Sequence, residues 1–340
     1  MLDPAHTRVL VTGGSGFIGT NLMAKLFAVG VPAVNLDVAP PLDPTQASAW
    51  LEGDVLDRAG LETALHQTEP THVVHLAGRV DIRGKTLEDY AANTKGTSNL
   101  LAVIQDLPDL RRLVVASTQF VVQPGHLPTS ETDYRPHTVY GESKVRVEEL
   151  TRRSRVPWVI VRPTTIWGPY DFAYRRHFYW TLDRGLYLHP KGVACFRSLG
   201  FVGNVAEQLI TILSAPEHDV VGQTFYLGDP VLNLIEFVDA VSEEIAGRPA
   251  RTVSAGLVRM MAAAGDILGA LRLPTPITTS RYRSMTEDYV VPIEPTLRLT
   301  GPPHYSMSEA AEITVRWLRN AGLIRSSSRR IATFDEMPKH

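Results

Sequence analysis

The stretch "VTGGSGFIGT" (residues 11–20) limits the fold more than any other feature of the chain. It places Gly13, Gly16 and Gly19 directly after a short β-branched run and at the start of an amphipathic helix. Glycines at these points allow a tight turn, let the backbone approach a pyrophosphate closely, and let the helix pack against the strand. The helix N-terminus adds amide donors and a partial positive charge. The stretch therefore predicts the strand–turn–helix unit of a dinucleotide-binding fold.

Strands and helices alternate through the first half of the chain. Helical patterns cover 87–105 and 138–154. The strand-like runs lie at 8–12, 33–37, 72–78, 112–118 and 158–163. This alternation predicts an α/β fold with a doubly wound parallel Rossmann sheet, in which the connections between strands are right-handed.

Asp37 ends the second of these runs, 18 residues beyond Gly19. A carboxylate at this point can accept hydrogen bonds from both hydroxyls of a cofactor ribose. The same negative charge repels the additional 2′-phosphate that distinguishes NADP from NAD. The glycine turn and this acid together therefore predict NAD as the cofactor.

Domain organisation follows from where the alternation stops. After Pro163, clusters of glycine, proline and aromatic residues replace it. Residues 1–165 are therefore expected to form the NAD-binding Rossmann domain, which would also carry the catalytic residues. Residues 166–324 are expected to form mainly a smaller C-terminal α/β substrate-binding lobe, with some segments returning to the Rossmann core. Residues 325–340 are polar and aperiodic, which predicts a flexible tail.

Composition and charge exclude several kinds of partner. Apolar residues make up 44% and charged residues 21% of the chain, as in ordinary soluble proteins, and the net charge of −2 provides no basic field for nucleic acid. The apolar stretch 255–274 is interrupted by Arg259, Asp266 and Arg272, so a membrane span is not expected. It predicts an amphipathic helix of a lid or lobe, with docking to a membrane surface as the alternative.

The sequence shows neither a targeting signal nor a metal-binding motif. The first residues have no apolar segment behind a basic one, so no secretory signal is expected. The single Cys195 excludes an intramolecular disulfide and suits a reducing compartment, which predicts a cytoplasmic location. No Cys/His cluster has the spacing of metal ligands, so no metal site is expected.

The segment "YGESK" places Tyr140 and Lys144 four residues apart, so on a helix both side chains lie on one face. A phenol with a reference pKa of about 10 is a weak base at neutral pH. A nearby ammonium and the positive ring of oxidised nicotinamide would favour the phenolate and lower that pKa. The pair therefore predicts a general base, and Lys144 could also hold the nicotinamide ribose.

With these features in place, the block "TGGSGFIG" makes the chain resemble the extended short-chain dehydrogenase/reductase family of nucleotide-sugar epimerases and dehydratases. The similarity runs from about residue 7 to about residue 320, and the landmarks "GDVLD", "HLAG" and "NTKGT" follow in the family's order. The resemblance implies that NAD is bound by Gly13, Gly16, Phe17, Ile18, Gly19, Asp37, Asp54, Val55, Leu76, Ala77, Gly78, Asn93, Ser117, Tyr140, Lys144 and Pro163.

The resemblance also implies a catalytic set of Thr118, Tyr140 and Lys144. Thr118 takes the place of the family's Ser or Thr that hydrogen-bonds the substrate oxygen, with Ser117 as the second choice. In the dehydratase branch two acids follow this residue, whereas here Gln119 and Phe120 follow it. An amide and a phenyl ring cannot act as acid and base, so loss of water is not expected.

The segment "FRSLGFVGNVAEQ" (196–208) is similar to the family's substrate-binding block. Arg197 matches the arginine that grips the substrate pyrophosphate, a role that suits its planar fork. The family's Asp, Tyr and second Asp are replaced by Ser198, Leu199 and Asn204. The substrate-binding residues that the resemblance implies are Thr118, Thr165, His177, Arg197 and Arg283.

The sequence thus predicts an NAD-dependent nucleotide-sugar epimerase, which oxidises its substrate transiently and returns the hydride to the other face. The first alternative is an NAD(P)-dependent dehydrogenase or ketoreductase of a sugar or sterol-like alcohol, which the apolar Leu199 and Phe201 favour. A noncatalytic NAD-sensing scaffold is the second alternative. The family's assembly implies a homodimer that pairs through helices at 87–105 and 139–154.

Overall fold

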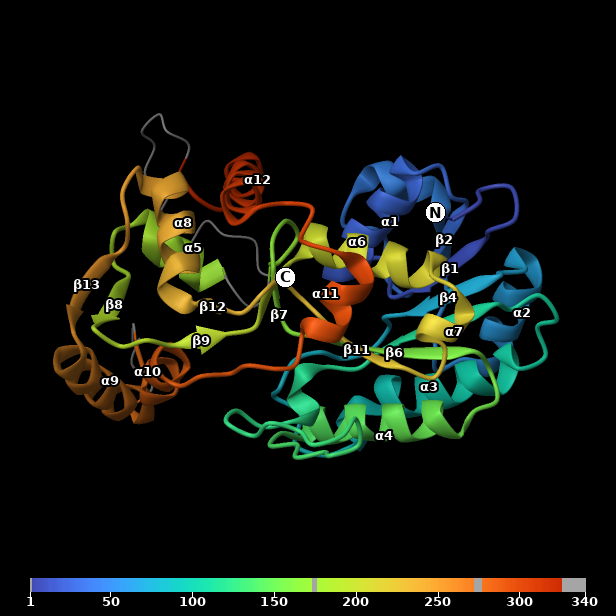
Figure 1. Cartoon of the computed structure of the whole chain (residues 1–340), viewed down its shortest axis with the longest axis horizontal. Helices are drawn as coiled ribbons and strands as arrows, with labels where there is room; N and C mark the ends of the chain where they lie inside the picture. Colours follow the sequence, from blue (N-terminus) through green and yellow to red (C-terminus); the bar gives the residue numbers. More distant parts are fainter. Residues whose placement is uncertain (1, 173–175, 272–276, 326–340) are drawn as a thin grey trace. The chain divides into compact units, whose positions relative to one another are not determined.

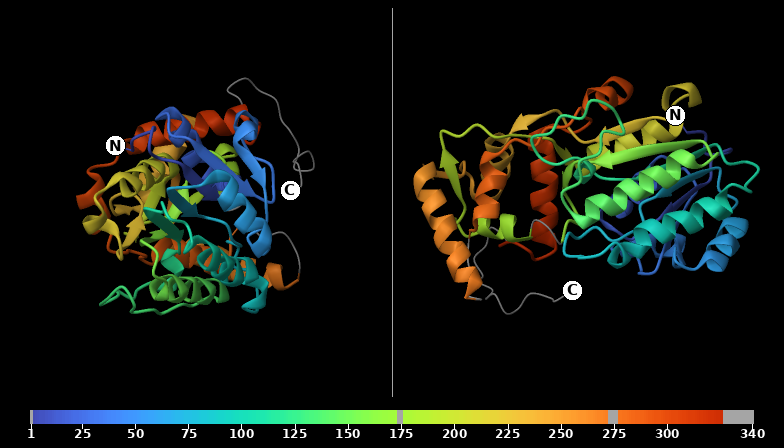
Figure 2. Two further views of the ribbon diagram at one scale, coloured as in Figure 1. Left: turned by 90° about the vertical axis from the view of Figure 1, so that its right-hand side faces the viewer. Right: turned by 90° about the horizontal axis from the view of Figure 1, so that it is seen from below.

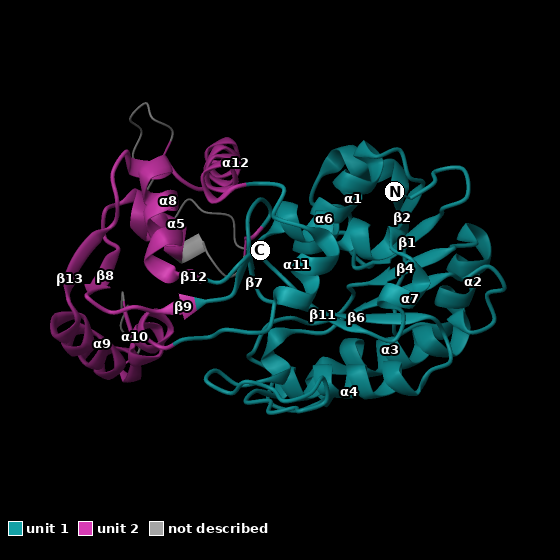
Figure 3. Cartoon of the chain, in the orientation of Figure 1, with its two compact units in different colours: residues 1–170, 197–231, 288–305 teal, residues 171–196, 232–287, 306–340 magenta. Residues whose placement is uncertain are grey.

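A computed structural model describes residues 2–172, 176–271 and 277–325 of the protein. The chain forms two compact units, which Figure 3 distinguishes by colour. Unit 1 comprises residues 1–170, 197–231 and 288–305. Unit 2 comprises residues 171–196, 232–287 and 306–340. The chain therefore passes from one unit to the other more than once.

Unit 1 is built on one sheet, in which every neighbouring pair of strands is parallel. Its strands are β1 (Val9–Thr12), β2 (Ala33–Asp37), β3 (Trp50–Glu52), β4 (His72–His75), β5 (Arg112–Ala116), β6 (Trp158–Pro163) and β11 (Thr224–Leu227). They follow the order β11-β6-β5-β4-β1-β2-β3 across the sheet (Figure 1). The order reverses between β1 and β4, at the kind of point where open α/β sheets bind ligands. The predicted doubly wound Rossmann sheet is confirmed.

Two strands end earlier than the sequence pattern predicts. The run expected at 72–78 ends at His75, and the run expected at 112–118 ends at Ala116. Beyond β5 the chain turns into a short 3-10 helix, η3 (Gln119–Val121). Strand-like composition continues past the last paired residue because these segments leave the sheet at its carboxyl edge, where they form loops.

Helices cover both faces of this sheet. On the face that carries Val9 and Val11 lie α1 (Phe17–Ala28) and α6 (Val202–Ser214). On the face that carries Leu10 lie α2 (Arg58–Thr68), α3 (Ala91–Ile104) and α4 (Val139–Arg153). Successive strand residues point to opposite faces, so the sheet separates two apolar cores. α3 and α4, which lie close to the predicted helices at 87–105 and 138–154, are side by side (Figure 2).

The remaining elements of unit 1 are short. β7 (Thr165–Trp167) pairs in parallel with β10 (Leu199–Phe201). α11 (Glu294–Thr300) packs against α6 and β11. The others are η1 (Pro44–Ala49), η2 (Glu88–Tyr90) and α7 (Glu217–Val220), with β9 (Phe196–Arg197) where the chain re-enters the unit.

Unit 2 combines a strand pair with helices. β8 (Leu188–Lys191) and β13 (Arg251–Ser254) are parallel. The other elements are α5 (Arg176–Asp183), β12 (Leu232–Asn233), α8 (Leu234–Ala246), α9 (Ala255–Ala270), α10 (Thr279–Thr286) and α12 (Met307–Asn320). The apolar stretch 255–274 forms α9 as far as Ala270, and no helix in the described ranges is long and apolar enough to cross a membrane. Of the predicted tail 325–340, only Arg325 lies within the described residues, and its side chain contacts Asp183.

Candidate active site

The glycine turn between β1 and α1 leaves no room for side chains at two points. Gly13 has φ +76°, and a Cβ built there would lie 2.5 Å from the Ala77 nitrogen. A Cβ at Gly19 would collide with the carbonyl oxygen of Gly13. α1 starts behind Gly16 without a side-chain cap, so its first amides, from Phe17 onward, have no acceptor within the helix. This bare helix start fits the pyrophosphate of a dinucleotide.

Asp37, the last residue of β2, is held beside the glycine turn. Its Oδ2 accepts a hydrogen bond from the Ser15 N–H at 3.1 Å, and its Oδ1 accepts one from the Ala39 N–H at 3.1 Å. Burial raises the pKa of Asp37, and the hydrogen bonds from Ala39 and Ser15 oppose that rise. The backbone therefore fixes the carboxylate from both sides. In the first turn of α1, the predicted Ile18 packs partly buried against the core.

The two residues predicted on the adenine side follow β3. Asp54 is exposed, and its Oδ1 accepts from the Leu56 N–H at 2.8 Å. Val55 is buried, and its carbonyl oxygen accepts from Asn99 Nδ2 on α3 at 3.0 Å. This loop is therefore fastened to α3 rather than left free at the edge of the sheet.

The loop that leaves β4 carries three of the predicted cofactor residues, Leu76, Ala77 and Gly78. The predicted Asn93, on α3, ties this loop to α4. Its Oδ1 accepts from the Arg79 N–H at 2.7 Å, while its Nδ2 donates to the Arg79 carbonyl at 3.0 Å and to Ser143 Oγ at 2.9 Å. Asn93 is fully buried, so its amide fixes the position of the loop relative to α4.

A buried histidine supports the same loop, although no sequence feature had indicated it. His75 Nδ1 lies 2.7 Å from Thr12 Oγ1, and its Nε2 lies 3.0 Å from Thr97 Oγ1. Burial, followed by the charge of Lys144, lowers the pKa of His75 to about 3. The ring is therefore neutral at physiological pH and acts as a hydrogen-bonded support.

Thr118 and Tyr140 meet at the carboxyl edge of the sheet. Thr118 lies two residues beyond the end of β5, Tyr140 lies in the first turn of α4, and the two side chains are close enough to interact. Thr118 Oγ1 also accepts from the Phe120 N–H at 3.3 Å. Burial raises the pKa of Tyr140 to about 12, although the interaction with the Thr118 side chain acts in the opposite direction. The phenol is therefore protonated at neutral pH.

Lys144 lies one turn after Tyr140 on the same helix, and its ammonium contacts the end of a strand. Its Nζ donates to the Ala116 carbonyl oxygen at 2.8 Å. Burial lowers the pKa of Lys144 to about 8, and the nearby Glu148 opposes that shift. The expectation that Lys144 and the oxidised nicotinamide ring together lower the pKa of Tyr140 concerns the protein with its cofactor; in the chain alone, burial raises this pKa.

The buried ammonium predicts a pH dependence of stability. The pKa of Lys144 is about 8 in the folded chain and 10.5 without perturbation, so the unfolded chain binds more protons between these values. The wild type should therefore gain stability relative to Lys144→Met as the pH rises, by about 2 kcal/mol between pH 7.5 and pH 10. Denaturant unfolding of both proteins across this range measures the difference, and a constant difference would contradict the low pKa.

Ser117, the second choice for the catalytic hydroxyl, has a different partner. Its Oγ donates to Glu148 Oε1 at 2.5 Å, and both residues are buried. Thr118 is therefore the hydroxyl that meets Tyr140. The predicted cofactor residue Pro163 ends the neighbouring strand β6.

Gln119 and Phe120, which follow Thr118 in the chain, carry no titrating group. Gln119 is buried, and its Nε2 donates to Oγ1 of the predicted substrate residue Thr165 at 2.9 Å. The Phe120 ring stacks on His137 with 5.4 Å between centres, and it meets the Tyr140 ring edge-on at 6.0 Å. Neither residue can supply the acid or the base of a dehydratase.

Arg197 is linked through Tyr289 to the backbone of Gln119. Its guanidinium lies 5.6 Å from the centre of the Tyr289 ring. The Tyr289 hydroxyl lies 3.0 Å from the Gln119 carbonyl oxygen and 2.6 Å from that of Val122. Tyr289 was not among the predicted site residues, because it belongs to none of the motifs, although it follows the predicted Arg283 by six residues.

The other two predicted substrate residues belong to unit 2. Arg283, on α10, is exposed, and its Nε lies 3.7 Å from the Glu287 carboxylate. His177 lies in α5, and its side chain is outside the described residues. Among the side chains that the structure describes, no group of three or more His, Cys, Asp or Glu could hold a metal ion.

The chain is similar to proteins of more than one activity. It matches the NAD dependent epimerase/dehydratase family over residues 9–228. A 3 beta-hydroxysteroid dehydrogenase/Delta 5-->4-isomerase of Mycobacterium tuberculosis is 29% identical, over 74% of this chain and 73% of that protein. A UDP-glucose 4-epimerase of Vibrio cholerae is 29% identical, over 65% of this chain and 70% of that protein. The structure of a Thermus thermophilus UDP-glucose 4-epimerase with NAD has a TM-score of 0.67 at 23% identity, over 92% of this chain and 99% of that one.

Proposed function

Because the chain belongs to the NAD-dependent epimerase/dehydratase family, we propose that it is a nucleotide-sugar epimerase that oxidises a secondary alcohol transiently. The observation that carries the proposal is the interaction of the Thr118 and Tyr140 side chains beyond the end of β5, with Lys144 one turn further along the same helix. A hydroxyl that holds the substrate oxygen and a phenol that exchanges its proton are the groups that such an oxidation needs.

The proton steps follow from the properties of these side chains. Bound NAD would supply the acceptor and donor of hydride for an oxidation of the substrate alcohol to a ketone and its reversal. Thr118 would hold the substrate oxygen, and Tyr140 would take the proton from it. Because burial keeps Tyr140 protonated, the phenol needs an additional positive charge nearby before it can act as this base. Once the ketone has turned in the site, Tyr140 would give the proton back.

We predict that the protein binds NAD more than ~10-fold more tightly than NADP, a difference of about 1.4 kcal/mol. The Asp37 carboxylate, held beside the glycine turn by the Ser15 amide, would repel a 2′-phosphate. Asp37→Asn should reduce the preference, whereas Asp109→Asn, at an exposed loop position, should leave it unchanged. Calorimetric titration with both cofactors measures the ratio, and equal wild-type affinities would contradict the role of Asp37.

Arg197 supports a nucleotide sugar as the substrate. A guanidinium can bind a pyrophosphate through two parallel hydrogen bonds. Arg197 is linked through Tyr289 to the backbone of Gln119, one residue from the hydroxyl of Thr118. The Vibrio cholerae relative, which is named a UDP-glucose 4-epimerase, supports the same class of substrate. Since Gln119 and Phe120 provide neither an acid nor a base, we expect no elimination of water from the sugar.

A second candidate is an NAD(P)-dependent dehydrogenase or ketoreductase of a sugar or sterol-like alcohol. The observation that favours it is the apolar surrounding of Tyr140, whose ring centre lies 5.9 Å from that of Tyr90 and 6.0 Å from that of Phe120. Leu199 and Phe201, both buried in β10, add to the apolar character of the substrate block. The Mycobacterium tuberculosis relative, named a hydroxysteroid dehydrogenase, supports this candidate.

Cofactor retention distinguishes the two candidates. An epimerase regenerates its NAD in every turnover, so we expect the purified full-length protein to carry NAD through gel filtration. The absorbance spectrum and the mass spectrum of the ligand released on denaturation measure this. A protein that elutes without nucleotide, and that acts only with added cofactor, would instead support the dehydrogenase.

We also infer a cytoplasmic homodimer that pairs through α3 and α4. On α4, Val147 is buried in the core of unit 1, whereas Val139, Val145 and Leu150 are partly exposed and available to a second subunit. The single cysteine of the sequence, Cys195, is buried, which suits the reducing cytoplasm. Light scattering at micromolar concentration should give twice the chain mass, and the mass of one chain would contradict the dimer.

A further inference from the structure

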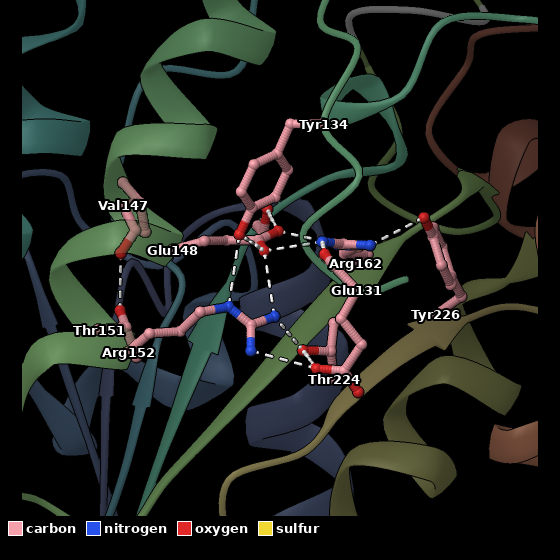
Figure 4. A network of polar contacts seen from close by, with 10 residues as sticks. Glu131, Tyr134, Val147, Glu148, Thr151, Arg152, Arg162, Thr224 and Tyr226 are labelled. Carbon is pink, nitrogen blue, oxygen red and sulfur yellow. Dashed lines mark hydrogen bonds and ion pairs between the residues drawn. The ribbon is translucent and has the colours of Figure 1, made fainter. Parts of the chain in front are cut away.

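A buried ion pair is part of the network of polar contacts in Figure 4. It joins Glu148 on α4, which is fully buried, to Arg162 on β6, which is 1% exposed. Glu148 Oε1 accepts from Arg162 Nε at 2.8 Å, and Oε2 accepts from Arg162 Nη2 at 2.8 Å. Ser117 Oγ is a further donor to Oε1. Each oxygen of the Glu148 carboxylate therefore accepts a hydrogen bond from Arg162, and Oε1 also accepts one from Ser117, just beyond the end of β5.

The other side of the pair is equally well satisfied. Arg162 Nη1 lies 3.0 Å from the Tyr226 hydroxyl, and Nη2 donates to the Glu131 carbonyl oxygen at 2.5 Å. The Tyr134 hydroxyl donates to Glu148 Oε2 at 2.9 Å. A buried polar network with all its hydrogen bonds made holds its members in one arrangement. Removal of the Glu148 charge would leave the Arg162 guanidinium buried without its ion-pair partner, whereas Arg152 Nη2 also lies 3.6 Å from Glu148 Oε2.

Ser117 and Lys144 connect this pair to the proposed catalytic groups. Ser117 directly precedes Thr118, and Glu148 lies one helical turn after Lys144 on α4. Lys144 Nζ donates to the carbonyl oxygen of Ala116, and Ser117 Oγ donates to Glu148. α4, which carries Tyr140, is therefore hydrogen-bonded to two successive residues at the end of β5, Ala116 and Ser117, immediately before Thr118.

We propose that Glu148, oriented by Arg162, is a positioning residue that fixes the Thr118 hydroxyl against the Tyr140 phenol. The inference rests on the proposed function, because only there do these two groups act together on a substrate. Replacement of a buried ion pair by apolar residues is often neutral or stabilising. The Glu148–Arg162 pair, with all its hydrogen bonds made, is therefore better explained by a need to position side chains than by a need to stabilise the fold.

Substitution at both ends of the link should slow the reaction. Glu148→Gln keeps the shape of the side chain and removes its charge, and we expect kcat for UDP-galactose to fall roughly 10- to 100-fold with unchanged NAD affinity. Ser117→Ala leaves the ion pair intact and should lower kcat by a smaller factor. Thr151→Val is the matched control on α4, since it removes a buried hydroxyl that donates to the Val147 carbonyl at 2.8 Å, and it should leave kcat unchanged.

A double-mutant cycle separates positioning from general destabilisation. If Glu148 acts through Thr118, then Thr118→Ala already removes the group that Glu148 positions. The variant Thr118→Ala/Glu148→Gln should therefore have the same kcat as Thr118→Ala alone. Effects that multiply would overturn the proposal while leaving the proposed function in place. Full activity of Thr118→Ala would refute the proposed function, and the role of Glu148 with it.

Amide hydrogen exchange gives a readout that needs no substrate. In Glu148→Gln and Ser117→Ala, the peptide covering residues 112–122 should exchange faster than in the wild type, while peptides from β1 and β2 keep their rates. If Glu148→Gln does not fold, Ser117→Ala alone decides. Wild-type exchange of residues 112–122 in every folded variant would overturn the proposal, even if kcat fell.

Discussion

Replacing Tyr140 by phenylalanine is expected to lower turnover by at least ~10²-fold, the low end of what a general acid–base group contributes. The substitution removes the phenol oxygen, which would exchange the proton with the substrate oxygen and which interacts with the Thr118 side chain. The ring itself stays, so its contacts with Tyr90 and Phe120 are kept. Fold and NAD affinity should therefore be unchanged.

Steady-state kinetics, calorimetric NAD titration and thermal unfolding of the variant test this together. Tyr187→Phe is the matched control, because it removes a tyrosine hydroxyl of unit 2 that lies 3.2 Å from His189 Nδ1. It should keep its activity. Near wild-type turnover in Tyr140→Phe would remove the phenol from the mechanism.

Gly13→Ala is expected to weaken NAD binding by more than ~10-fold. The alanine would be strained at φ +76°, and its Cβ would press on the Ala77 nitrogen, so the turn and the loop after β4 must move apart. Both segments belong to the predicted cofactor site. Left-handed strain alone costs about 1–2 kcal/mol, which affects stability more than binding.

Gly30→Ala separates strain from collision. Gly30 has φ +73°, close to that of Gly13, but no atom lies within 4 Å of a Cβ built there. Gly30→Ala should therefore lose the stability that left-handed strain costs while keeping its NAD affinity, as measured by thermal unfolding and calorimetry. Equal NAD affinity in Gly13→Ala and Gly30→Ala would show that the collision with the loop does not matter for the cofactor.

The parts of the site that the sequence predicted are those that depend on residues near one another in the chain. The glycine turn, Asp37 at the end of β2, and the spacing of Tyr140 and Lys144 each follow from one strand, one turn or one helix face. The order of strands and helices was enough to predict the doubly wound sheet. Short-range pattern and backbone geometry therefore account for most of unit 1.

The supporting contacts could not be predicted, because they depend on how elements lie over one another. Ser117 and Glu148 are separated by 31 residues, and they meet only through the register of α4 over β5. Tyr289 reaches Gln119 across 170 residues. In the chain alone burial raises the pKa of Tyr140, and burial of a polar atom is not visible in residue spacing.

The most direct measurement of the central claim is incubation of the wild-type protein with UDP-, GDP- and dTDP-hexoses in heavy water, followed by mass spectrometry and NMR. We expect a product of unchanged mass, with one inverted carbon and no carbon-bound deuterium, formed without added reduced cofactor. Return of the same hydride to the other face of the ketone gives this result. A product lighter by one water, or conversion that occurs only with added reduced cofactor, would contradict the epimerase.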